Sequence, residues 1–237
     1  MIFFDRDEFI RAWSIVHPEG DPVEIRIFGQ RGRSNILSGY FTDPVKAADA
    51  IEKIPLSGCT VCWTINQLHP GCLARMQRGQ IVQAGITTAD TDVIRRLWLP
   101  IDLDPDRPSG CSASDEELKG AEEMAEKIAS TLTGNGYPDP LKVHSGNGVH
   151  LLFPMDAPNT KEAAAACKSF LEDMGRKFDN ESVHIDAGIF NAARVMKAPG
   201  TCATKGAHAP DLGRSWRMAR LFDSCRDYVR PEEVIEL

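Results

Sequence analysis

The sequence predicts a mixed fold of helices and strands, in the α/β or α+β class. Strand-like apolar segments alternate with amphipathic helical segments along its 237 residues, which is typical of this class. With 42% hydrophobic and 26% charged residues, the composition is that of an ordinary globular protein. We find no run of eighteen apolar residues, and the opening MIFFDRDEF becomes charged at once. We therefore expect no membrane span, no signal peptide and a cytoplasmic location.

Residues 1–96 are expected to form a first module of the α/β type. The second of its two helices should begin with Asp43 as N-cap and Pro44 in its first turn. Three segments rich in β-branched and aromatic residues are expected to be strands. The helices are predicted at 4–13 and 43–54, and the strands at 24–28, 36–42 and 60–66. After the first helix the order is thus β-β-α-β.

Residues 97–237 continue with longer elements. An apolar strand over 97–105 precedes a long amphipathic helix with acidic residues in its first turns. The segment 211–223 fits either a strand or a short helix, and its pattern does not decide between them. The other expected elements are strands at 141–145 and 149–154 around a Gly-Asn-Gly turn, helices at 112–132 and 160–178, a strand at 183–190, and mostly loop over 191–208.

The seven cysteines show no disulfide-scaffold pattern, which suits a reducing compartment. Four residue types that can ligate zinc cluster at Cys59, Cys62, His69 and Cys72. However, the segment 60–66 is expected to be a strand, so the first two thiols would point to opposite faces. We therefore expect buried thiols and no structural zinc.

The net charge of −7 argues against a protein that coats nucleic acid by charge alone. The charge is unevenly distributed, however. Residues 191–230 hold eight basic and three acidic residues, a net of +5, whereas residues 101–130 hold nine acidic and three basic residues, a net of −6. An acidic site beside a basic segment suits a metal with a polyphosphate, and a merely solvated basic surface remains the alternative.

Asp102 and Asp104 interrupt the apolar strand LWLPIDLDP. Alternate strand residues point the same way, so both carboxylates should lie on one face, opposite Ile101 and Leu103. Two neighbouring anions repel each other, and burial raises the cost. A divalent cation would remove both objections, and Mg²⁺ or Mn²⁺ prefers such oxygen ligands. An Asp-x-Asp in a surface loop remains the alternative.

Two further stretches carry candidate site residues. In HSGNGVHLLFP, Ser145, Gly146, Gly148 and His150 fit a phosphate cradle, because glycines let backbone amides approach an anion; a plain hairpin turn is the alternative. In VHIDAGIFNAARVMKAPGT, the lone acid in an apolar strand would complete a metal site, and two basic residues follow as phosphate ligands or as ordinary ion-pair partners. These three residues are Asp186, Arg194 and Lys197.

In this order the motifs IDLDP, SGNGVH and HID resemble those of the archaeo-eukaryotic primase superfamily, and more narrowly the primase-polymerase domains of phages, plasmids and mobile elements. The resemblance spans roughly residues 20 to 222 and includes NAARVMKAPGT followed by Lys-Gly. The sequence departs from the family at HPGCLARM, residues 69–76, where an Asn-Pro loop is usual.

The resemblance implies an RNA-recognition-motif-like catalytic core in residues 97–237 with the 1–96 module packed beside it, as one integrated catalytic domain. It also implies a DNA primase-polymerase that carries out template-directed nucleotidyl transfer on DNA template and primer with nucleoside triphosphates, and it leaves open a helicase partner. Two Mg²⁺ or Mn²⁺ ions would be held by Asp102, Asp104 and Asp186. The triphosphate would be bound by Ser145, Gly146, Gly148, His150, Arg194, Lys197 and Lys205.

Two other functions remain open. A metal-dependent glycosyltransferase would use Asp-x-Asp for a nucleotide sugar, but it leaves SGNGVH and Asp186 without a role. A replication-initiator domain that binds DNA without catalysis is the other, and the presence of all three acids argues against it.

Overall fold

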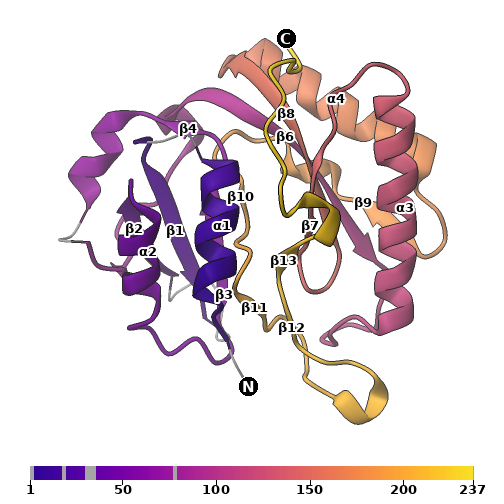
Figure 1. The fold of residues 1–237 in the computed structure, drawn as a ribbon, viewed down its shortest axis with the longest axis horizontal. Helices are drawn as coiled ribbons and strands as arrows, with labels where there is room; N and C mark the ends of the chain where they lie inside the picture. The colour runs from indigo at the N-terminus through magenta and orange to yellow at the C-terminus, as the bar shows by residue number, and fades with distance from the viewer. Residues whose placement is uncertain (1–2, 18–19, 30–35, 77–78, 237) are drawn as a thin grey trace.

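The computed structural model describes residues 3–17, 20–29, 36–76 and 79–236, in which two large β-sheets lie side by side and a third sheet has two short strands (Figure 1). The described helices are α1 (Arg6–Val16), α2 (Pro44–Ile51), α3 (Asp115–Thr133) and α4 (Lys161–Phe178). The described strands are β1 (Val23–Phe28), β2 (Ile36–Phe41), β3 (Thr60–Thr64), β4 (Gln67–Leu68), β5 (Val82–Gln83), β6 (Val93–Pro105), β7 (Leu141–His144), β8 (Val149–Pro158), β9 (Val183–Ile185), β10 (Val195–Lys197), β11 (Cys202–Ala203), β12 (Arg217–Met218) and β13 (Arg220–Leu221).

The second sheet has the RNA-recognition-motif-like topology that the family resemblance implies. This sheet has the strand order β13-β7-β8-β6-β4, and β9 also pairs with β6. Its central elements follow the order β6-α3-β7-β8-α4-β9 along the chain. The four strands among them are arranged β7-β8-β6-β9, and every pair is antiparallel. Helix α3 packs on β6 and β8, while α4 packs on β9. The predicted α+β class and the packed first module are therefore confirmed.

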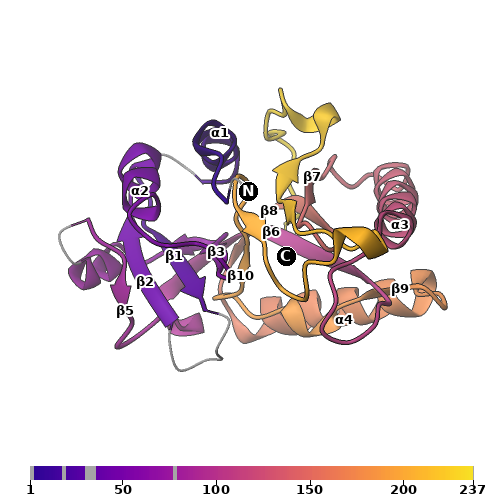
Figure 2. The ribbon, with the colours of Figure 1, turned by 90° about the horizontal axis from the view of Figure 1, so that it is seen from below.

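The first sheet takes one strand from the second half of the chain. Its order is β10-β3-β1-β2-β5, so β10 lies beside β3 although more than a hundred residues separate them in the sequence. In return, β4 pairs with β6 of the second sheet. The predicted boundary between the two modules, after residue 96, lies inside β6. The division of the chain into these two modules stays a prediction. In Figure 2 the first sheet lies beneath α1 and α2, next to the second sheet.

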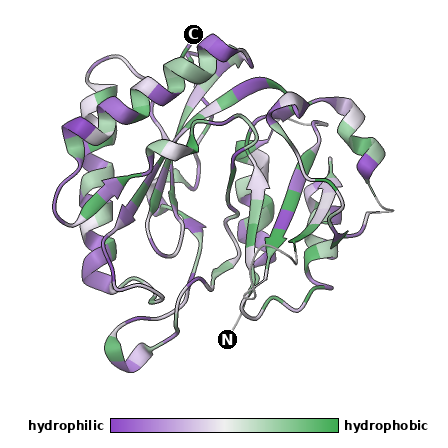
Figure 3. Ribbon diagram, turned by 180° about the vertical axis from the view of Figure 1, so that it is seen from behind, coloured by the Kyte–Doolittle hydropathy of each residue, from purple (hydrophilic) through white to green (hydrophobic). Residues whose placement is uncertain are grey.

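The four helices form where the sequence predicts them, because their ends are capped by side chains. Asp43 caps α2 as predicted, accepting hydrogen bonds from the backbone N–H of Val45 at 2.8 Å and of Lys46 at 3.2 Å. At α3, Ser114 and Glu117 form a capping box. Figure 3 shows hydrophilic and hydrophobic residues alternating around the two long helices. None of the helices in the described segments combines the length and apolar character needed to cross a membrane.

One expectation about the last third of the chain needs correction, and one open choice is decided. The strand expected over 183–190 ends at Ile185, because the Asp186 side chain accepts a hydrogen bond from the Gly188 N–H and opens a 3₁₀ turn. The segment 191–208 is mostly loop, as expected, and it also contains β10 and β11, which are too short to show a period of two. The undecided segment 211–223 holds the two-residue strands β12 and β13.

One hydrophobic core includes buried residues of both large sheets. Trp98 of β6 is 1% exposed, and its indole Nε1 donates to the carbonyl of Val16 at 2.8 Å, which joins the second sheet to the end of α1. His17 follows α1 and lies between Trp13 and Trp63, with ring centroids 4.8 Å from each. Its Nε2 is buried and has no hydrogen-bond partner among the described residues.

The buried His17 should make the protein acid-sensitive. Burial lowers the pKa of His17 to about 3, so the unfolded chain binds a proton below about pH 6.5 that the folded protein does not take up. Stability from this group is therefore complete above pH 6.5 and falls as the pH falls. Between pH 8 and pH 5, the unfolding free energy of wild type should fall by about 2 kcal/mol relative to that of His17→Phe, as measured by urea unfolding.

The matched control is His184→Gln, because the His184 side chain is 48% exposed. It should follow the wild-type pH dependence. A His17→Phe protein whose unfolding free energy falls with pH as steeply as that of wild type would contradict the assignment.

Candidate active site

Strand β6 presents its two aspartates on one face, as the strand alternation predicts. Ile101 and Leu103 are fully buried on the opposite face, whereas Asp102 and Asp104 are partly exposed. The two carboxylates therefore lie on the side of the sheet that the core does not fill.

Neighbouring strands bring two more predicted residues to Asp102. His150 of β8 is its register partner, and the His150 Nε2 lies 3.4 Å from an Asp102 carboxylate oxygen. On the other side, the backbone N–H of Asp186 donates to the Asp102 carbonyl at 3.0 Å. The central position of β6 between β8 and β9 thus gathers three separate sequence motifs.

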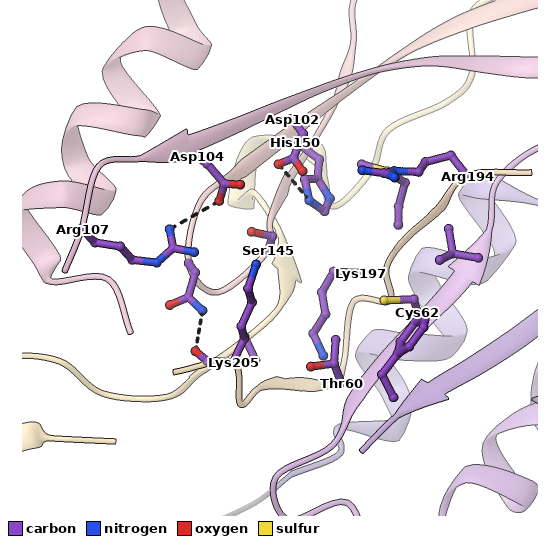
Figure 4. A pocket seen from close by; sticks show the side chains of 15 residues that line it. Thr60, Cys62, Asp102, Asp104, Arg107, Ser145, His150, Arg194, Lys197 and Lys205 are labelled. Carbon is purple, nitrogen blue, oxygen red and sulfur yellow. Dashed lines mark hydrogen bonds and ion pairs between the residues drawn. The ribbon is translucent and has the colours of Figure 1, made fainter. Parts of the chain in front are cut away.

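A pocket of about 390 Å³ opens between the two sheets at this point (Figure 4). Strands β3 and β10 of the first sheet contribute one wall, and β6 with the turn after β7 contributes the other. The predicted site residues that line it are Asp102, Asp104, Ser145, His150, Arg194, Lys197 and Lys205. Asp186, Gly146 and Gly148 do not line this pocket.

The two glycines have a packing reason to be glycine. A Cβ on Gly148 would lie 2.3 Å from the Leu103 carbonyl oxygen, and one on Gly146, where φ is +96°, would lie 2.4 Å from the Cβ of Ala203. They let the turn lie close to β6 and β11. Their contact with a nucleotide stays a prediction.

The environment of Asp102 in the pocket strongly raises its pKa. Burial, and then the negative charges of Asp104 and Asp186, raise the pKa of Asp102 to about 8, against the opposing effect of Arg194 and Lys205. A group so disposed gains strongly from a cation placed beside it. The oxygen donors of these aspartates are the type that Mg²⁺ and Mn²⁺ prefer, so the residues present fit such an ion.

The donor set is open rather than closed. In the described part of the chain, no three His, Cys, Asp or Glu side chains are grouped so that they could hold a metal ion by themselves. Such an incomplete set of protein ligands agrees with the coordination preference of Mg²⁺, which usually binds one or two carboxylates and completes its shell with substrate phosphates and water.

Burial lowers the pKa of two basic groups in the pocket. Lys197 is only 8% exposed, its Nζ donates to the carbonyl of Cys202 at 2.8 Å, and burial lowers its pKa to about 8. Burial also lowers the pKa of His150 to about 4. At neutral pH, Lys197 is therefore a cation within the protein, while His150 is a neutral hydrogen-bonding group.

Several pocket residues are not among those predicted from the sequence. Arg107 donates to Asp104 at 3.4 Å, and Asn147 accepts from the Ala113 N–H at 2.9 Å while donating to the Lys205 carbonyl at 3.2 Å. Both sit within or just after predicted motifs, so proximity to Asp104 and to the Gly-Asn-Gly turn was the available signal. Cys62 and Thr60 line the pocket because β3 faces it, which no local pattern indicates.

The residues of the candidate zinc cluster have separate environments. Cys59 donates to the Pro55 carbonyl, Cys62 lines the pocket, and Cys72 packs in a small core cluster with Tyr40. His69 accepts from the Gly71 N–H at 3.0 Å. The expectation of no structural zinc stays a prediction.

No family model matches the sequence, and no curated protein matches it. Several solved structures resemble this one. The crystal structure of primase RepB′ matches with a TM-score of 0.49 and 10% sequence identity, over 92% of this chain and 56% of that chain. The polymerase domain of Ligase D from Mycobacterium tuberculosis, in complex with DNA, matches with a TM-score of 0.47 and 16% identity, over 90% of this chain and 79% of that chain. This chain therefore spans little more than half of the RepB′ chain.

Neutralising Asp102 should stabilise the metal-free protein. Because the folded-state pKa of Asp102 is raised to about 8, the folded protein keeps a proton there that the unfolded chain loses near pH 4, so this group costs stability as the pH rises from 4 to 8. In EDTA at pH 8, Asp102→Asn should therefore unfold at higher urea than wild type, by ~1 kcal/mol or more, and the difference should shrink toward pH 5. A mutant that is less stable than wild type at pH 8 would instead make Asp102 a structural hydrogen-bond acceptor.

Proposed function

We propose that this protein is a DNA primase-polymerase that transfers nucleotides from nucleoside triphosphates to a primer on a DNA template. One observation carries the proposal: Asp102 and Asp104 on β6 face a pocket whose other wall supplies Lys197, and the Asp186 backbone is hydrogen-bonded to Asp102 just outside the pocket lining. Carboxylates and fixed cations facing one cavity between two sheets suit a metal-bound triphosphate.

Asp102, Asp104 and Asp186 would hold Mg²⁺ or Mn²⁺. When bound, two such ions stabilise both the attacking and the leaving oxygen of an in-line displacement at the α-phosphate, in which a 3′-hydroxyl attacks and pyrophosphate leaves. The raised pKa of Asp102 means that its carboxylate gives up a proton when it takes up this role.

The remaining pocket residues bind and orient the triphosphate. Lys197 offers a buried ammonium, and Arg194 and Lys205 offer guanidinium and ammonium donors that strengthen on meeting phosphate oxygens. The Ser145 hydroxyl and the neutral His150 imidazole supply hydrogen bonds without adding charge. The DNA template and primer would approach the open side of the pocket.

A DNA-binding initiator domain without catalysis is the second candidate. Such a domain has no need to keep a carboxylate in an environment that raises its pKa to about 8, because an unpaired buried charge weakens the fold. A glycosyltransferase that binds a nucleotide sugar would leave Asp186 and His150 unexplained. Incubating the protein with Mn²⁺, labelled nucleotides and a primed DNA template distinguishes the three functions.

Asp102→Asn should abolish most nucleotide incorporation. The change preserves the shape of the side chain but removes the charge that holds the cation, and a loss of ~4 kcal/mol in transition-state stabilisation lowers the rate about a thousandfold. Primer extension in Mn²⁺ measures it. The matched control is Asp106→Asn, four residues along, whose side chain is 67% exposed and which does not line the pocket. Activity of Asp102→Asn within tenfold of wild type would rule out the metal-ligand role.

Arg194→Ala and Lys197→Ala should raise the KM for nucleotide and leave DNA affinity unchanged. Each loses a charge-assisted bond worth ~1.5–3 kcal/mol, or about tenfold or more. Because the pKa of Lys197 is lowered to about 8, nucleotide affinity should also fall above pH 8, and Lys197→Ala should lose this dependence. Arg226→Ala, with a 61% exposed side chain in the same basic segment, is the control. If both measured affinities fall equally, these residues belong to the template groove.

A further inference from the structure

Each of the three aspartates faces a basic side chain. The contacts are single rather than bidentate, and they come from three different parts of the chain. They join Asp102 to His150 at 3.4 Å, Asp104 to Arg107 at 3.4 Å, and Asp186 to Arg194 at 3.1 Å. Asp104 and Asp186 are thus each paired with an arginine counter-ion, whereas Asp102 lies against His150, which is neutral at neutral pH.

The two arginines of these pairs also line the pocket. Arg107 lies at one end, beside Asp104, and Arg194 lies toward the other end (Figure 4). The Arg107 side chain is 15% exposed, and its Nη1 donates to the Pro105 carbonyl at 3.3 Å as well as to Asp104. Each arginine therefore borders both a carboxylate and the space in which a nucleotide would lie.

Other arginines of this protein make much stronger pairs. Arg214 binds Glu117 through two nitrogens at 2.8 and 2.6 Å, and Arg75 binds Asp92 through two at 2.8 and 2.7 Å. Neither of these arginines lines the pocket. The bidentate geometry is the strong form of the interaction, and a single long contact to a partly exposed group is the weak form. The single contacts of Arg107 and Arg194 at the site are of the weak form, so breaking them should cost little.

We infer that Arg107 and Arg194 exchange partners during nucleotide binding: they are counter-ions of Asp104 and Asp186 in the metal-free protein and ligands of the triphosphate once those carboxylates turn to a divalent cation. This rests on the proposed function and adds Arg107 to the nucleotide site. Its consequence is reciprocal coupling, because a cation frees the arginines for phosphate, and phosphate frees the carboxylates for the cation.

Removing a residue from a binding site ordinarily weakens binding, but the exchange predicts that removing an arginine strengthens the binding of Mn²⁺. Removing either arginine frees a carboxylate, so Arg107→Gln and Arg194→Gln should bind Mn²⁺ alone about two- to fivefold more tightly than wild type, the worth of one partly exposed ion pair. The same variants should bind nucleotide more weakly. Mn²⁺ affinity is measured by electron paramagnetic resonance on the free protein, and thermal melts in EDTA confirm folding.

Lys205→Gln controls for a simple change of charge, because Lys205 lines the same pocket and, among the described residues, forms no ion pair with any of the three aspartates. It should gain less Mn²⁺ affinity than either arginine variant. The gain from Arg194→Gln should also disappear when it is combined with Asp186→Asn, since the freed carboxylate is then gone.

The inference is overturned if both arginine variants bind Mn²⁺ no more tightly than Lys205→Gln, or if the gain from Arg194→Gln survives in full with Asp186→Asn. That result would leave the proposed function intact wherever wild type binds Mn²⁺ through Asp102 and extends primers. A wild-type protein that neither binds Mn²⁺ nor incorporates nucleotides overturns both.

Discussion

The burial of an ionisable carboxyl, that of Asp102, in the central strand of the second sheet is the constraint on which the rest of the site depends. Strand β6 must be buried on its helix-facing side for the fold to form, and Ile101 and Leu103 meet that need. The alternation of a strand then forces Asp102 and Asp104 onto the other face, where partial burial makes an unpaired anion costly. The pocket, its basic side chains and its opening toward solvent all reduce that cost.

The topology supplies the compensating groups. Because β6 is central, it has a neighbour on each side, and these neighbours carry His150 and the segment that begins with Asp186. The chain then crosses to the first sheet as β10, which places Lys197 opposite the aspartates. The two sheets therefore do more than pack together, since one holds the acids and the other holds a buried cation.

The elements with many residues were predictable, and the site depends partly on elements that were not. The helices carry caps and long amphipathic patterns, and the face of β6 follows from Asp102 and Asp104 alternating with apolar residues. Strand β10 has three residues, too few for a periodic pattern, and only its long-range pairing with β3 makes it a strand. The role of Gly148 follows from a contact with Leu103, which lies 45 positions earlier in the sequence. Such contacts leave no local trace, so motif spacing could identify the acids but not the residues that surround them.

The charge balance of the site bears on the order in which its ligands bind. Three aspartates stand near four cations, Arg107, Arg194, Lys197 and Lys205. In the proposed function, two divalent cations alone would add four positive charges to a site that already has no excess of negative charge. A triphosphate alone would meet the carboxylates at close range. Together the two ligands nearly cancel, since the triphosphate brings about as many negative charges as the ions bring positive ones. The site is therefore suited to take metal and nucleotide as one unit, which is the behaviour expected of arginines that pass from carboxylate to phosphate.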